Sequence, residues 1–149
     1  MTDDQARHGG TLRLYGPGSM DHLDPSCAYY MLGGQIIRLF ARQLFTYRPV
    51  ADLRDPTAVT PVPDLADGPY QLSPDGRTYT FRIRRGVRYA PPVDREVRAQ
   101  DFIYAVERQL DPARPSPNPY LRLIRGAGAF AAGKAREISG MRALGPHTL

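Results

Sequence analysis

The pattern of apolar and polar positions predicts two helices before any other element. Over residues 99–110 the apolar side chains recur every three or four positions, the spacing of one face of an α-helix. They are Ala99, Phe102, Ile103, Val106 and Leu110. A weaker helical period runs over residues 29–45, through Gly33, Ile37, Phe40 and Leu44. One or two further short helices are expected over residues 120–135.

Alternation of apolar and polar residues predicts strands elsewhere, beginning with residues 9–16. Residues 70–73 and 77–84 flank the sequence Ser-Pro-Asp-Gly, in which proline presets its own φ angle and glycine tolerates a positive one. These two segments therefore predict a β-hairpin. Between them and the first helix lies a segment rich in proline and aspartate, in which we expect irregular structure with one short strand. Residues 138–149 offer a strand, a turn and the start of another strand.

Arginines are interspersed with aromatic residues over residues 73–89. This composition is compatible with a strand that binds nucleic acid. Alternate residues of a strand share a face. One face would hold Tyr79, Phe81, Ile83, Val87 and Tyr89, with Arg85 among them, and the other Thr78, Thr80, Arg82, Arg84 and Arg88. A sheet that binds single-stranded nucleic acid needs aromatic rings and cations on the same face. The pattern favours an ordinary strand with a solvated basic face, ending or bending at Arg85.

Composition limits the classes of protein that fit this chain. Its 149 residues, 42% hydrophobic and 23% charged, are typical of one soluble globular domain. Fifteen prolines and 14 glycines predict a loop-rich fold with short elements. The net charge of +5 permits an acidic partner without requiring one. The single cysteine, Cys27, excludes an internal disulfide, no apolar run is long enough to span a membrane, and the polar first residues do not form a signal peptide.

No catalytic or metal-binding set is expected. The three histidines, His8, His22 and His147, lie in separate polar stretches without metal-ligand spacing. Asp21 and Asp24 could ligate a metal, but a turn whose carboxylates accept backbone hydrogen bonds is the favoured interpretation. Cys27 is interpreted as a small, partly buried residue rather than a nucleophile. The sequence thus predicts neither an enzyme nor a bound cofactor.

Several motifs in order resemble the family 5 extracellular solute-binding proteins, the oligopeptide-, dipeptide- and nickel-binding components of ABC importers. Along residues 9–149 they read GGTLRL, LDP, PDLA, SPDGRTYTFRIRRGVRY, AQDFIYAVERQLDP, SPNPYL and GAFAAGKAREISGMRAL. Two departures from the family pattern are the absence of tryptophan after PDLA and the sequence YAPPVDRE in place of F-x-D-G.

The resemblance implies an α/β, type II periplasmic-binding-protein-like fold, whose two lobes close on a ligand. The chain would be the N-terminal quarter to third of such a protein. Residues 1–8 would form a disordered tail and 9–45 the start of the main ligand-binding lobe, including its first strand. Residues 46–149 would form a mixed α+β subdomain that runs into the return to the main lobe.

The resemblance also implies a function. The protein would capture peptides or a similar small solute outside the cytoplasm, in the periplasm or at the cell surface, and deliver them to ABC permease subunits. The sequence itself contains no signal peptide or lipidation site. By analogy with the family, the candidate ligand-binding residues are Tyr29, Tyr30, Met31, Asn118 and Tyr120, with ordinary packing as the alternative for each.

Two other functions stay open from the residues alone. One is a basic nucleic-acid-binding module, although the strand pattern predicts no nucleic-acid partner. The other is a stand-alone interaction domain derived from a binding protein.

Overall fold

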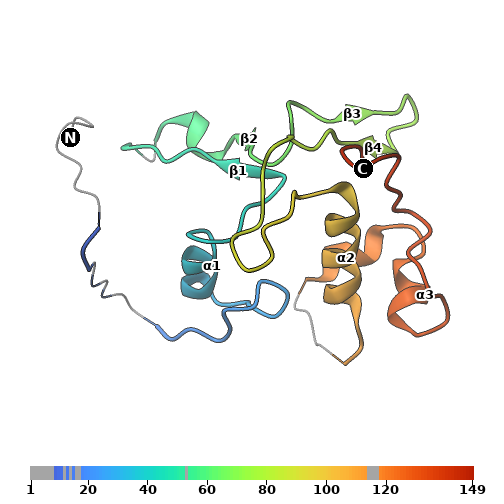
Figure 1. Cartoon of the computed structure of the whole chain (residues 1–149), viewed down its shortest axis with the longest axis horizontal. Coiled ribbons are helices and arrows are strands. Elements are labelled where there is room, and N and C mark those ends of the chain that lie inside the picture. The colour runs from blue at the N-terminus through green and yellow to red at the C-terminus, as the bar shows by residue number, and fades with distance from the viewer. Residues whose placement is uncertain (1–8, 12, 14, 16–17, 53, 114–117) are drawn as a thin grey trace.

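The computed structural model describes residues 9–11, 13, 15, 18–52, 54–113 and 118–149. Strands lie along one side of the molecule and helices along the other (Figure 1). The elements in chain order are α1 (Met31–Ile37), β1 (Phe45–Tyr47), the 3₁₀ helix η2 (Pro56–Val59), β2 (Pro61–Pro63), β3 (Gln71–Leu72), β4 (Tyr79–Thr80), α2 (Ala99–Leu110), the 3₁₀ helix η3 (Pro119–Leu123) and α3 (Ala127–Ala131). The many prolines and glycines accordingly give short elements, as predicted.

Antiparallel pairing joins segments that are distant in the sequence. β1 pairs with β2, with Thr46 opposite Val62. Residues 81–84 lie between two further segments: the Ile83 amide donates to the His147 carbonyl at 2.9 Å, and the Ala66 backbone pairs with Ile83 on the other side. Arg82 also pairs with Thr148 in an isolated bridge. Residues 138–149 therefore contribute single antiparallel bridges but form neither of the strands that were predicted there.

The hairpin predicted around the Ser-Pro-Asp-Gly turn is confirmed. β3 and β4 pair antiparallel, and the Ser73 amide donates to the Thr78 carbonyl at 2.9 Å. Gly76 has a φ angle of 69°, which explains the glycine at this turn position. The expected bend at Arg85 is also present, since the chain turns there and Gly86 has a φ angle of 76°.

The helix predicted over residues 29–45 is wrong in its second half. α1 ends at Ile37, and Phe40, expected on its apolar face, is 60% exposed. The reason is competition from the sheet: the Leu44 carbonyl accepts hydrogen bonds from the amides of Asp64 and Ala66, at 2.9 and 3.1 Å. Pairing with a distant segment thus overrides the local helical period.

The helix predicted over residues 99–110 is confirmed, and η3 and α3 fulfil the expectation of short helices over 120–135. α2 begins without a capping side chain at Arg98, but the Asp101 carboxylate accepts from the Arg98 amide at 2.8 Å. That bond satisfies one of the free donors at the helix start. The buried residues Leu110, Ala127 and Ile138 form the core between α2, α3 and the following segment.

The separation of faces predicted for residues 79–89 holds at the centre of the strand. Ile83 is 2% exposed, whereas Arg82 and Arg84 are exposed. Arg84 nevertheless has a structural role, described below. Tyr79 is 50% exposed and belongs to an open aromatic cluster with Phe45, Tyr70 and Phe81, whose neighbouring ring centroids lie 5.3 to 6.5 Å apart.

Some predictions fall outside the described residues. The tail over 1–8 does so entirely, and the strand over 9–16 does so at positions 12, 14 and 16. The domain division between 45 and 46 stays a prediction, and β1 crosses it. None of the helices in the described ranges is long and apolar enough to cross a membrane.

Candidate ligand-contact surface

Three exposed side chains stand together at the start of α1. Tyr29 is 73%, Tyr30 52% and Met31 80% exposed, and Tyr30 is the N-cap residue of the helix. These three residues are called the 29–31 surface below. Aromatic rings and a flexible thioether are side chains that adapt to varied apolar ligands. Their exposure leaves them available for contact.

Asp21 fixes the backbone that carries the 29–31 surface. Its carboxylate accepts from the amides of Tyr29 and Tyr30, at 2.6 and 3.1 Å, and from the amide of His22 at 2.8 Å. These bonds, with the Tyr29 amide first, hold the pKa of Asp21 below its usual value. The close approach requires Gly33 in α1, because a Cβ there would lie 3.0 Å from an Asp21 carboxylate oxygen.

A second aspartate ties the same loop to α2. The Arg108 guanidinium donates through both terminal nitrogens to the Asp24 carboxylate, with Nη1 and Oδ1 2.7 Å apart. Arg108 Nη1 also donates to the Ser26 hydroxyl at 3.0 Å, and that hydroxyl donates to Asp24 at 2.7 Å. Arg108 thereby lowers the pKa of Asp24 well below its usual range. The loop is held to a helix that begins some 75 residues later in the chain.

Both aspartates accept hydrogen bonds from backbone amides, as the sequence interpretation of a turn predicted, and Asp24 in addition binds Arg108, which that interpretation did not predict. Within the ranges that the structure describes, no group of three or more histidine, cysteine, aspartate or glutamate residues could hold a metal ion.

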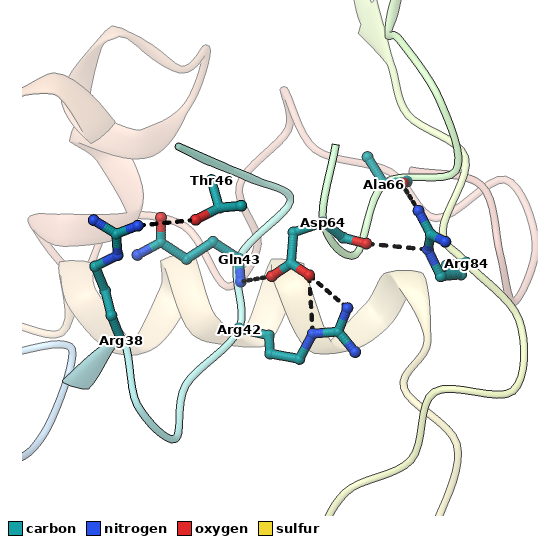
Figure 2. Close-up of polar contacts among 7 residues, drawn as sticks. All are labelled: Arg38, Arg42, Gln43, Thr46, Asp64, Ala66 and Arg84. Atoms are coloured by element: carbon teal, nitrogen blue, oxygen red, sulfur yellow. Dashed lines mark hydrogen bonds and ion pairs between the residues drawn. The ribbon is translucent and has the colours of Figure 1, made fainter. Parts of the chain in front are cut away.

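Asp64 connects the segment after α1 to the strand region by hydrogen bonds from Arg42 and Arg84. Figure 2 shows its carboxylate accepting from the Arg42 side chain, with Nε at 3.0 Å, and from the Gln43 amide at 3.3 Å. Its backbone carbonyl accepts from Arg84 Nε at 3.1 Å, and Arg84 also reaches the Ala66 carbonyl at 3.5 Å. Burial acts to raise the pKa of Asp64, but the bonds from Arg42 and Gln43 outweigh it and the pKa is lowered.

Arg38 couples the end of α1 to β1 in the same region (Figure 2). Its Nη2 lies 3.3 Å from both the Thr46 hydroxyl and the Tyr47 carbonyl. The 29–31 surface is thus anchored from its own loop, from α2 and, through α1, from the sheet. Hydrogen bonds that fix the backbone before binding reduce the entropy that a contact surface loses when a ligand binds.

The other two predicted ligand residues lie on η3. Asn118 is the N-cap residue, and its side-chain oxygen accepts from the Tyr120 amide at 3.1 Å. Tyr120 is 75% exposed. η3 packs against α3, whereas the 29–31 surface is anchored to α2 and the sheet. A ligand shared by the two groups stays a prediction.

Two cavities in the described part of the chain are lined by other residues. One, of about 350 Å³, lies beside the Asp24–Arg108 pair and is lined by Tyr104, Glu107, Arg108, Asp111, Pro112, Phe130 and Ala135. The other, of about 360 Å³, is lined by Asp67, Arg82, Ile83, Arg85, His147 and Thr148. Sequence reasoning identified neither cavity and missed the partners of Asp24 and Asp64. Those partners lie 84 and 22 positions away, where no local pattern indicates them.

Solved structures of peptide-binding proteins have the same fold. The Clavulanic acid biosynthesis oligopeptide binding protein 2 aligns over 95% of this chain and 26% of its own, with a TM-score of 0.70 and 31% identity. The Escherichia coli murein tripeptide binding protein MppA aligns over 85% of this chain and 23% of its own, with a TM-score of 0.66 and 29% identity. The expected type II periplasmic-binding-protein fold is thus confirmed.

Residues 60–149 match the family described as bacterial extracellular solute-binding proteins, family 5 middle. The chain therefore belongs to family 5 of the bacterial extracellular solute-binding proteins, as the resemblance implied. Among curated relatives, oligopeptide-binding protein OppA of Bacillus subtilis is 46% identical over 65 residues, which are 43% of this chain and 12% of OppA. Di/tripeptide-binding protein 2 of Pseudomonas aeruginosa is 39% identical over 74 residues, 44% of this chain and 14% of that protein. The chain thus spans only a small part of the length of its curated relatives.

Proposed function

We propose that this chain is part of the solute-binding component of an ABC importer, with peptides or a similar small solute as its ligand. The observation that carries the proposal is the family match over residues 60–149. The relatives' names support a peptide ligand, since they include oligopeptide-, dipeptide- and di/tripeptide-binding proteins. Another relative, of Haemophilus influenzae, is named for heme, so the solute class is not uniform among the relatives.

The 29–31 surface is the proposed ligand-contact region in this chain. Its three side chains are each more than half exposed, and the loop beneath them is held by Asp21 and by the Asp24–Arg108 pair. Apolar side chains of a ligand would cover these groups and remove apolar area from water, which favours binding by about 25 cal/mol per Å². Asn118 and Tyr120 are the second proposed contact region.

The proposed mechanism is binding followed by closure of two lobes, without a covalent step, and then delivery of the solute to a permease. A ligand favours closure only by the contacts that it makes better in the closed state. The two proposed contact regions supply one wall of such a site. This chain by itself should therefore bind peptides no better than in the millimolar range.

The test combines calorimetry with amide NMR on the 149-residue chain. Titration with a mixed peptide library should give no micromolar binding, whereas millimolar peptide should shift the amide resonances of the 29–31 surface. Met31→Ala should abolish those shifts. Val59→Ala is the matched control, because Val59 is 77% exposed on η2, outside the proposed regions. Shifts that survive Met31→Ala unchanged, or micromolar binding, would contradict the proposal.

A further inference from the structure

The second cavity lies where three backbone segments meet, and none of its lining residues belongs to the 29–31 surface. The Asp67 amide donates to the Arg82 carbonyl at 2.8 Å, and the Ile83 amide to the His147 carbonyl at 2.9 Å. These two bonds align Asp67, Arg82 and His147 across neighbouring strands. Arg85 reaches the same cavity from the turn that follows the central strand. The volume, about 360 Å³, is within the range of small-molecule sites.

Within the part of the chain that the structure describes, the side chains of Arg82 and Arg85 make no hydrogen bond, although Arg85 interacts electrostatically with Glu96. Arg38, Arg42, Arg84 and Arg108, by contrast, all donate to acceptors in the protein. A guanidinium presents paired N–H donors that match the two oxygens of a carboxylate. Two such groups at one cavity favour an anionic ligand group.

His147 also lines the cavity and has a ring nitrogen that makes no hydrogen bond within the described residues. Its Nε2 lies 3.6 Å from a Glu96 oxygen, and the other Glu96 oxygen accepts from the Gly86 amide at 2.7 Å. Nδ1 of His147 is buried and has no hydrogen-bond partner among the described residues. Buried polar nitrogens nearly always have a partner. The imidazole, which is 16% exposed, thus has one buried ring nitrogen without a partner among the described residues.

Asp67 limits the kind of anion that fits. Asp67 lines the cavity together with Arg82 and Arg85, so residues of both charge signs surround it. A compact ligand with one carboxylate and a neighbouring donor would satisfy both. A polyanion would bring further negative charge close to Asp67 and Glu96, where like charges repel.

From this arrangement we propose that the cavity binds a small organic carboxylate, with Arg82 and Arg85 holding the carboxylate and Asp67 accepting from a donor group beside it. The site is independent of the proposed transport function, because its residues are distinct from the 29–31 surface and from η3. A negative result at one site therefore leaves the other unaffected.

The test is an amide NMR titration of the full chain with sodium acetate, glycine or inorganic phosphate, at constant ionic strength. Acetate carries the carboxylate alone, and glycine adds an ammonium group for Asp67. We expect saturable shifts at Asp67, Arg82 and His147, with glycine binding more tightly than acetate and phosphate more weakly than either. Arg82→Gln or Arg85→Gln should weaken acetate binding about tenfold, the effect of losing one charge-assisted pair of bonds.

Arg77→Gln is the matched control. Arg77 is exposed in the hairpin turn and does not line the cavity, so its replacement removes the same charge and should leave binding unchanged. Asp67→Asn should remove the advantage of glycine over acetate. The proposal is overturned if no saturable shift occurs, if Arg77→Gln weakens binding as much as Arg82→Gln, or if phosphate binds as tightly as glycine.

Discussion

Replacement of Asp24 by asparagine tests whether the ion pair with Arg108 holds the loop before the 29–31 surface on α2. Asp24→Asn keeps the shape of the side chain but removes its charge and one of its acceptor oxygens. The Arg108 guanidinium then loses the charge of its partner and the acceptor oxygen that its Nη2 contacts, whereas the oxygen that accepts from Ser26 and from Nη1 can remain. The amides of Tyr29 and Tyr30 keep their bonds to Asp21. The loop should loosen from α2 without unfolding.

The magnitude follows from the exposure of the pair. Hydrogen bonds to charged groups contribute about 1.5–3 kcal/mol when buried, and exposed ion pairs about 0–1 kcal/mol. The side chains of Arg108 and Asp24 are 31% and 30% exposed, so an intermediate loss of about 1–2 kcal/mol in the free energy of unfolding is expected. With a urea m-value of about 2 kcal/mol/M, the midpoint should fall by roughly 0.5–1 M.

The assay is urea unfolding followed by circular dichroism at pH 7, with Asp52→Asn as the matched control. Asp52 also bonds an arginine through both oxygens, but that partner, Arg54, is two positions away and 91% exposed. The control should keep the wild-type midpoint. Equal midpoints for wild type and Asp24→Asn would refute the reasoning, because the long-range pair would then contribute no more than a local surface pair.

The pH dependence gives a second, independent check on the same pair. Folding lowers the pKa of Asp24 from its ordinary value of 3.8. A lowered pKa means that the stabilisation is fully present above the unfolded value and is lost as the pH falls through the folded value. The difference between wild type and Asp24→Asn should therefore be constant from pH 7 to about 5 and shrink below pH 4. A difference that stays constant down to pH 2 would contradict an ionic origin.

Two further predictions concern packing. Gly126→Ala should destabilise the fold by about 2–3 kcal/mol, because Gly126 has a φ angle of 82° and a Cβ there would lie 2.5 Å from the Ser139 hydroxyl. Gly128→Ala, in α3 with nothing within 4 Å, should instead be neutral or slightly stabilising, and equal effects of the two changes in thermal unfolding would contradict this account. Ile83→Ala should cost about 2–5 kcal/mol, since Ile83 is 2% exposed in the central strand. The Leu123 side chain is 83% exposed, so Leu123→Ala should change the urea midpoint little. A larger effect of Leu123→Ala than of Ile83→Ala would contradict the assignment of Ile83 to the core.

Elements with strong local signals were predictable from the sequence. α2 has its apolar stripe, the β3–β4 hairpin has a turn sequence with proline and glycine, and the bend at Arg85 adjoins a glycine that adopts positive φ. The order of motifs also indicated the family. The helix, the hairpin and the bend depend on backbone preferences and side-chain periodicity over a dozen residues or fewer, which are present in the sequence itself.

The tertiary structure decided where α1 ends and what holds the candidate sites. Leu44 has helical spacing in the sequence, but its carbonyl bonds the amides of Asp64 and Ala66, because sheet pairing there satisfies backbone groups that a longer helix would have used. Similarly, Asp24 occurs in an ordinary turn sequence, and only the folded chain brings Arg108 to its carboxylate. The cavity lined by Arg82 and Arg85 likewise forms where three segments of the chain meet. Pairing between distant residues depends on the whole packed chain, so local sequence patterns determine the elements and long-range contacts determine their ends and their sites.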